Sequence, residues 1–245
     1  MAANIHILNG DALAEQFQAS ELTEPYICWR EVLVEGPLSS ESAAALFFLR
    51  EAYLDQKYPD SERSYGSFVR PEMRKVTNLP ANASVFLWFE DDLFCQVNMW
   101  AILWLLSTRD DLRIFRVFPA ETPPEYRWLG FGVSSPEELP IALKEAVPLS
   151  HAEIELGVEL WKAFVKQDLS ELTRISVCDS VAFRGLKEVV EAWRDHPRRI
   201  QATIQRLLDE GVTEFGSIFR TVGKEHGIYG FGDLQIKQIF DDMIS

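Results

Sequence analysis

Short apolar runs alternate with longer helical patterns along the first half of the chain. The apolar runs, rich in β-branched and aromatic residues, predict strands near residues 4–8, 26–34, 84–89 and 113–118. Apolar positions that recur three and four residues apart predict helices at 12–19, 40–56 and 93–107. This alternation is typical of βα units around a mostly parallel sheet, and nearly continuous apolar runs are typical of strands covered on both faces.

The pattern changes after residue 118. Residues 119 to 140 are rich in Pro, Gly and Ser, which indicates a crossing segment or a domain boundary, and strand signals then nearly vanish. Ser135 and Ser150 are each followed three residues later by Glu, so capping boxes predict helix starts there. Further helices are expected at 150–167, 183–195, 198–209, 214–225 and 233–244. We therefore predict an α/β fold: a Rossmann-like, mostly parallel sheet domain over residues 1–130, then an all-α domain over residues 131–245 with a helix-turn-helix-like segment at 204–222.

Two of the predicted strands run directly into acidic residues. The first leads into Asn9, Gly10 and Asp11, and the third into Glu90, Asp91 and Asp92. Ligands of open α/β sheets bind beyond the carboxyl ends of the strands, so carboxylates at these positions can hold a metal or move a proton. If the two strands are neighbours, Asp11, Glu90 and Asp92 converge and would bind Mg²⁺ or Mn²⁺.

Each candidate residue also has a structural interpretation. Asp11 and the acids at 90–92 stand where helices begin, and acidic side chains stabilise helix N-termini. Asn9 and Gly10, beside a helix start, are the expected cofactor-binding residues, although they lack the glycine fingerprint of dinucleotide folds. Arg30 either holds a substrate anion or forms an ion pair at the strand edge. The residues expected to take part in catalysis are Asp11, Arg30, Glu31 and Glu90.

The charge of the chain narrows the class of ligand. The 245 residues carry a formal net charge of −14, which repels nucleic acid and favours a small substrate over a polymer. The one basic patch is offset by Asp195; its members are Arg194, Arg198, Arg199 and Arg206. Three cysteines without metal-ligand spacing predict buried, reduced thiols in a cytoplasmic protein, and the apolar runs are too interrupted to predict a membrane span. His6, inside the first strand, is expected to be a core histidine.

Three ordered motifs carry a resemblance to a known family. They are His6 to Asp11, then Trp29-Arg30-Glu31 before Glu35-Gly36-Pro37, then Trp88 to Gln96. With these motifs the chain resembles the bacterial domain-of-unknown-function 1835 family, closely over the α/β half and more loosely through Tyr229 to Leu234. The resemblance implies no particular activity. It favours Glu90 and Asp92 over Asp91, because relatives often have another residue type at position 91.

The sequence leaves two classes of function open. The first is a metal-assisted hydrolase or transferase that acts on a small phosphorylated or nucleotide-like molecule through the acidic crevice. The second is a non-enzymatic module that senses a ligand or engages a protein partner, with the helix-turn-helix-like segment in its C-terminal domain. A homo-oligomer is compatible with both classes.

Overall fold

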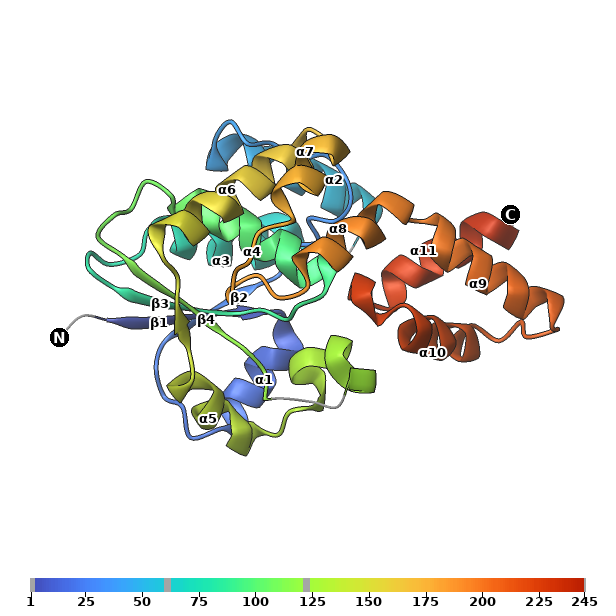
Figure 1. The fold of residues 1–245 in the computed structure, drawn as a ribbon, viewed down its shortest axis with the longest axis horizontal. Coiled ribbons are helices and arrows are strands. Elements are labelled where there is room, and N and C mark those ends of the chain that lie inside the picture. The colour runs from blue at the N-terminus through green and yellow to red at the C-terminus, as the bar shows by residue number, and fades with distance from the viewer. Residues whose placement is uncertain (1–2, 60–62, 121–123, 245) are drawn as a thin grey trace.

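A computed structural model of the chain describes residues 3–59, 63–120 and 124–244. Its centre is a five-stranded sheet in the order β2-β1-β3-β4-β5. The first four strands are parallel, and the short β5 pairs antiparallel with β4 (Figure 1). The strands are β1 (Asn4–Asn9), β2 (Tyr26–Trp29), β3 (Ser84–Trp88), β4 (Arg113–Val117) and β5 (Val147–Pro148). The predicted α/β class and mostly parallel sheet are confirmed.

Strands β1 and β3 are neighbours and occupy the middle of the sheet. Ile7, Val85 and Leu87 are fully buried, as their continuous apolar runs predict for strands covered on both faces. Strand β2 is shorter than expected: the predicted strand at 26–34 ends at Trp29, and the chain turns away through Gly36, whose φ is 78°. Residues 30–34 therefore cross the end of the sheet instead of extending it.

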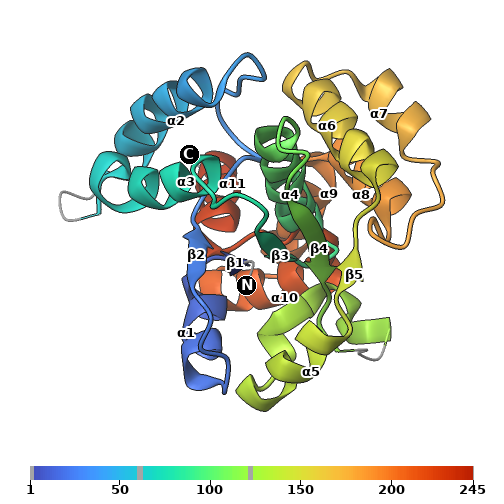
Figure 2. The same ribbon diagram turned by 90° about the vertical axis from the view of Figure 1, so that its left-hand side faces the viewer.

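Helices cover both faces of the sheet (Figures 1 and 2). One face carries α1 (Asp11–Ala19), the 3₁₀ segment η2 (Pro124–Val133), the 3₁₀ turn η3 (Pro136–Glu138) and α5 (Leu139–Lys144). The other face carries α2 (Ala43–Lys57), the π-helical turn η1 (Tyr65–Val69), α3 (Arg70–Thr77), α4 (Leu93–Leu106) and α6 (His151–Val165). Helix α4 is buried on nearly all sides, including its polar Gln96 and Asn98, so it is the central helix of the core.

The α/β unit extends past the predicted boundary at residue 130. Strand β5 joins the sheet, and α6 packs along α4, where Gly157 lies against Leu103 closely enough that a side chain there would collide. Helices α7 (Leu169–Ile175) and α8 (Leu186–Asp195) continue this layer. The segment 131–195 therefore belongs to the first unit, because its apolar faces complete the sheet's core. Residues 121–123 of the expected boundary segment lie outside the described residues.

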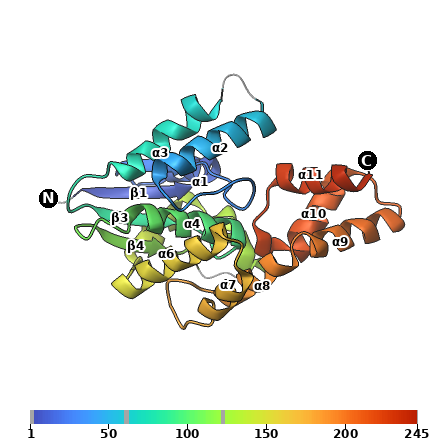
Figure 3. The same ribbon diagram turned by 90° about the horizontal axis from the view of Figure 1, so that it is seen from above.

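The last helices form a separate cluster beyond the carboxyl edge of the sheet (Figures 1 and 3). They are α9 (Arg198–Asp209), α10 (Phe215–Glu225), the 3₁₀ turn η4 (Gly227–Tyr229) and α11 (Asp233–Ile244). Helices α9 and α10 make the predicted helix-turn-helix, and the capping boxes at Ser135 and Ser150 are confirmed. Within the described ranges, each helix is too short or too polar to cross a bilayer.

Candidate functional site

The order of the strands reverses between β1 and β3. The chain passes from β1 through α1 to β2 in one direction, and from β3 through α4 to β4 in the other. Helices α1 and α4 lie on opposite faces of the sheet (Figure 1), so their starts diverge and leave a crevice at the carboxyl ends of β1 and β3. Ligands of open α/β sheets bind at this kind of topological switch point. Asn9 ends β1 at this crevice, and Glu90 to Asp92 follow β3 there.

Glu90, Asp92 and Cys95 form one compact group at this crevice. Ligand atoms from the three side chains all lie within 4.8 Å of one another, and no other group of three or more such residues occurs in the part of the chain that the structure describes. The Cys95 thiol donates to Glu90 Oε2 at 2.9 Å and accepts from Asn9 Nδ2 at 3.0 Å. Asp92 caps helix α4, since its Oδ1 accepts from the Cys95 amide at 2.9 Å.

Burial without a cationic partner dominates the electrostatics of this group. Asp92 is only 3% exposed. Desolvation, followed by the charge of Glu90, raises the pKa of Asp92 to about 7. Desolvation also raises the pKa of Glu90 and of the Cys95 thiol. Among the described residues, neither carboxylate forms an ion pair with a lysine or an arginine, so the pair would share a proton or a cation at neutral pH.

Two glycines from distant segments hold the backbone directly against the carboxylates. Gly130 in η2 has φ 51°, and a Cβ there would overlap the Glu90 side chain. Gly230, which follows η4, has φ 63°, and a Cβ there would overlap the Asp92 carboxylate. Both positions therefore require glycine for conformation and for space. The helical end of the chain thus contributes to the surroundings of Asp92.

A cavity of about 280 Å³ opens onto the group. Asn9, Glu90, Asp92 and Cys95 are its polar walls, together with Gln16 of α1. Its apolar walls come from α1, α4 and η2 and include Leu13, Phe94, Trp128 and Phe131. The donor atoms are therefore accessible to a small ligand or ion.

Asp11, by contrast, lies outside the group of three and does not line the cavity. It is the first residue of α1, where Gly10 occupies the cap position, and its side chain is 51% exposed. Its Oδ1 accepts from Arg30 Nε at 2.9 Å and lies 2.7 Å from Arg30 Nη2, and the hydrogen bond lowers the pKa of the Asp11 carboxyl. Arg30, which directly follows β2, thus neutralises the charge of Asp11. The predicted convergence of Asp11 with Glu90 and Asp92 is not what the structure shows.

Arg30 and Glu31 do not form a rim of the cavity either. Arg30 is engaged by Asp11 and packs over the Phe68 ring, 4.1 Å from its centroid. Glu31 is buried, pairs with the buried Arg50 at 3.0 Å and accepts from the Tyr65 hydroxyl. Both side chains stabilise the turn that follows β2. Glu31 lies beyond the end of β2 at Trp29, and the sequence pattern did not reveal that its side chain is buried.

Of the two residues expected to bind a cofactor, only Asn9 lines the cavity. The Gly10 amide donates to the carbonyl oxygens of Leu8 and Trp29, at 3.0 and 2.9 Å, so it is not free to hold an anion. Asp91 is the least favoured of the three acids as a site residue. It forms an ion pair with the buried Arg116 at 2.8 Å. Arg116 also donates to the Glu90 carbonyl at 2.9 Å and thereby positions the backbone of the β3 exit.

Two expectations about cysteine need correction. Cys178 is exposed, so only Cys28 and Cys95 are buried thiols. Cys95 is also a member of the polar group, a role the sequence analysis missed. The signal was the spacing of Asp92 and Cys95, because a cap residue and the residue three positions later lie side by side at a helix start.

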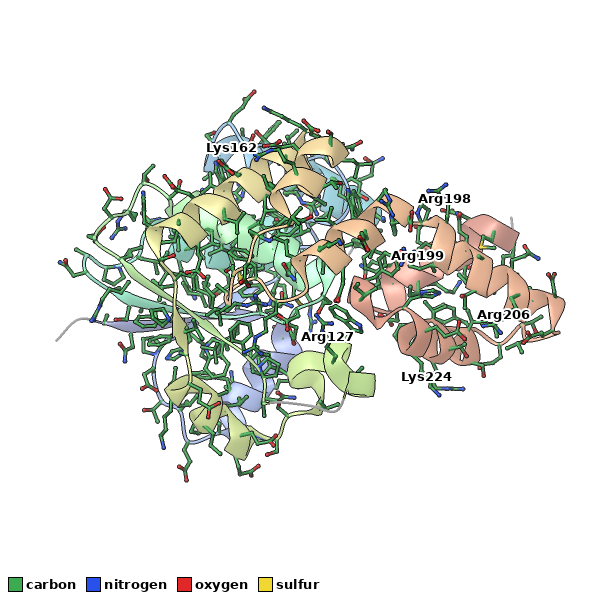
Figure 4. All side chains as sticks on the ribbon, in the orientation of Figure 1. Arg127, Lys162, Arg198, Arg199, Arg206 and Lys224 are labelled. Carbon is green, nitrogen blue, oxygen red and sulfur yellow. The ribbon has the colours of Figure 1, made fainter. Side chains whose placement is uncertain are left out.

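The histidine and the basic patch behave as structural elements. His6 is fully buried, and its Nδ1 accepts from the Trp88 indole at 2.9 Å, which confirms the core assignment. Arg199 pairs with Asp195 at 2.5 Å, and Arg206 pairs with Glu225 at 2.8 Å, so acids neutralise much of the patch on α9 (Figure 4).

The donor set can hold a divalent cation, because ligand atoms of two carboxylates and one thiol lie close together. Carboxylate oxygens are the ligands that Mg²⁺ and Mn²⁺ prefer, and a thiolate is a ligand that Zn²⁺ also accepts. The expectation of Mg²⁺ or Mn²⁺ stays a prediction.

Comparisons with known proteins give no indication of function, so a function can be argued only from the site. No protein-family model, no curated protein and no solved structure matches the chain. The resemblance to the domain-of-unknown-function 1835 family therefore stays a prediction.

Proposed function

We propose that this protein is a metal-assisted hydrolase or transferase that acts on a small phosphorylated or nucleotide-like molecule. The observation that carries the proposal is the group of Glu90, Asp92 and Cys95: two carboxylates without a cationic partner, beside a thiol, open to a cavity at the switch point. A divalent cation held there would act as a Lewis acid toward a phosphoryl oxygen and would acidify a bound water.

The chain's own residues have distinct tasks in this proposal. Glu90 already accepts the thiol hydrogen bond, so it is placed to relay the proton that Cys95 must lose to water in the cavity, which leaves both side chains deprotonated to bind the cation. The amide of Asn9 donates to the sulfur and orients it. A cytoplasmic setting would keep this thiol reduced.

Turnover tests the proposal directly. Protein stripped with a chelator should hydrolyse 4-nitrophenyl phosphate only after addition of Zn²⁺ or Mn²⁺, and Asp92→Asn should remove both turnover and metal binding. Asp11→Asn is the matched control, because Asp11 follows the neighbouring strand and lies outside the group. Equal metal binding by wild type and Asp92→Asn would refute the proposal.

One observation favours the ligand-sensing alternative. The backbone at Gly230 rests on Asp92, so occupancy of the site would bear on the C-terminal helices. Metal binding that changes the protection of α10 and α11 without any turnover would support a sensor in place of an enzyme.

A further inference from the structure

A second cavity, of about 680 Å³, opens beside the first. One wall is η2, and the opposite wall is formed by α10, η4 and the start of α11. Its lining is mainly aromatic and aliphatic, with side chains from Trp128, Leu129, Phe219, Val222, Tyr229 and Phe231. We call this cavity the interdomain groove. Its volume and apolar lining match those of sites that bind small organic ligands.

The interdomain groove adjoins the cavity of the acidic group. Trp128, Leu129 and Gly230 line both cavities, whereas Glu90, Asp92 and Cys95 line only the smaller one. Gly230 rests on the Asp92 carboxylate, so the boundary shared by the two cavities lies next to a proposed metal ligand. The path from the acidic group toward α10 therefore runs past this boundary and into the groove.

The two ends of this path differ in charge. The inner end holds Glu90 and Asp92, whereas Arg220 and Lys224 of α10 line the groove. Figure 4 shows Lys224 on α10. Arg127 of η2 does not belong to this margin, because it pairs with Glu188 at 2.8 Å and does not line the groove. Arg220 makes only a long ion pair with Glu214, at 3.9 Å, and Lys224 has no ion pair within the described ranges. In a chain of net charge −14, such a basic margin favours a negatively charged group.

We propose that the substrate is an organic phosphate with an apolar body that carries a second anionic group. Its phosphoryl end lies at Glu90, Asp92 and Cys95, its body lies in the interdomain groove, and Lys224 with Arg220 attracts the far anion. This inference rests on the proposed function, because it assigns the phosphoryl end to the cation site.

Alkylphosphonates of increasing chain length test the groove, because they mimic phosphate esters and resist hydrolysis. Each is paired with the analogue that ends in a carboxylate, and calorimetry on the zinc-loaded protein measures affinity. Affinity should rise about fourfold for each buried methylene. The terminal carboxylate should add roughly twofold to fivefold at the chain length that reaches α10.

Two variants separate the two parts of the proposal. Gly223 lines the groove, and a Cβ there meets no atom within 4 Å, so Gly223→Leu adds an apolar side chain to the groove wall and improves helix propensity. This variant should lose the dependence on chain length. Lys224→Gln should keep that dependence and lose the carboxylate increment. Both should bind Zn²⁺ as tightly as the wild type.

The outcomes distinguish the groove from the metal site. Tight Zn²⁺ binding by the wild type with affinities that ignore chain length would overturn the groove assignment and leave the metal site standing. The same would follow if Gly223→Leu kept the full length dependence. Absence of Zn²⁺ binding by the wild type would overturn the proposed function and, with it, the placement of the phosphoryl end.

Discussion

At the scale of single residues, the distinctive feature is a pair of carboxyl groups, Glu90 and Asp92, that have no arginine or lysine partner among the described residues. Asp11 and Asp91 each form an ion pair with an arginine, at 2.7 and 2.8 Å. Glu90 and Asp92 instead accept hydrogen bonds from a thiol and from amides, and the charge of Glu90 acts on Asp92. Burial of unpaired charge is costly, and the pKa of a carboxyl rises in response. These two residues therefore gain most from a bound cation.

The pH dependence of stability follows from the raised pKa of Asp92, about 7 against an ordinary value of 3.8. Between these values the folded protein keeps a proton that the unfolded chain releases, so the contribution of Asp92 to stability falls as pH rises through that window. Without metal, Asp92→Asn should flatten this slope and raise the free energy of unfolding above neutral pH, by on the order of 1–3 kcal/mol. Urea denaturation in chelator at acidic and alkaline pH measures it.

Two buried histidines, His6 and His196, give the free energy of unfolding the opposite dependence on pH, and the comparison with Asp92→Asn removes their effect. Burial lowers the pKa of His6 and His196 to about 4, so their contribution is lost as pH falls from about 6.5 toward 4. Wild type and Asp92→Asn share this loss, and only the difference between them reports on Asp92. A variant less stable than the wild type on the alkaline side would contradict the assigned burial cost.

The glycines against the carboxylates give a second prediction at this scale. Gly230→Ala places a methyl group on the Asp92 carboxylate and in a left-handed backbone, so it should destabilise the fold by about 1–3 kcal/mol and weaken metal binding. Gly132→Ala is the control, because its Cβ has no neighbour within 4 Å. Thermal unfolding and calorimetry compare them, and equal behaviour would show that the contact is not tight.

At the scale of elements, the site depends on strand order. The sequence predicts β1 and β3 as central strands, and their adjacency brings Asn9 to the acids that follow β3. Asp11 is only two residues beyond Asn9, yet it faces Arg30 at the β2 exit. Two residues of one strand-to-helix turn thus contact different parts of the molecule: Asn9 contacts the acidic group, and Asp11 contacts Arg30.

Local pattern could predict much of this fold, and the limits have physical causes. The apolar periodicity places α4, α6, α9 and α11 closely, because packing and local preference agree in them. It misses α3 and α7, which are short and carry few apolar positions. The sequence also makes Glu31 a candidate for catalysis, because nothing local records its ion pair with Arg50, nineteen residues away. Contacts between Cys95 and Asn9 likewise depend on tertiary structure.

The buried ion pair predicts a purely structural effect. Arg50→Met leaves Glu31 buried without its charge partner, so it should cost about 3–5 kcal/mol of stability. Arg174→Met breaks an exposed pair with Glu171 on α7 and should change stability far less, because water screens that pair. Chemical denaturation measures both. If Arg50→Met abolished metal binding while leaving stability intact, the role assigned to Glu31 would be wrong.

At the scale of the whole molecule, the C-terminal helices complete the site from outside the sheet. Helices α9 to α11 stand beyond its carboxyl edge (Figure 3), and the turn between η4 and α11 reaches back to Asp92. Bound metal should therefore slow hydrogen exchange in η2 and around Gly230, two segments far apart in the sequence. Mass spectrometry with and without Zn²⁺ detects this, and protection confined to α4 would show that the helical end is independent of the site.

The most direct test locates the cation itself. In crystals of zinc-loaded protein, anomalous scattering should place one ion among Glu90, Asp92 and Cys95, with a sulfur ligand about 2.3 Å away. Cys95→Ser should lose the sulfur ligand, and Asp92→Asn should lose the ion. An ion bound at Asp11 or elsewhere, with none at the β3 exit, would contradict the account.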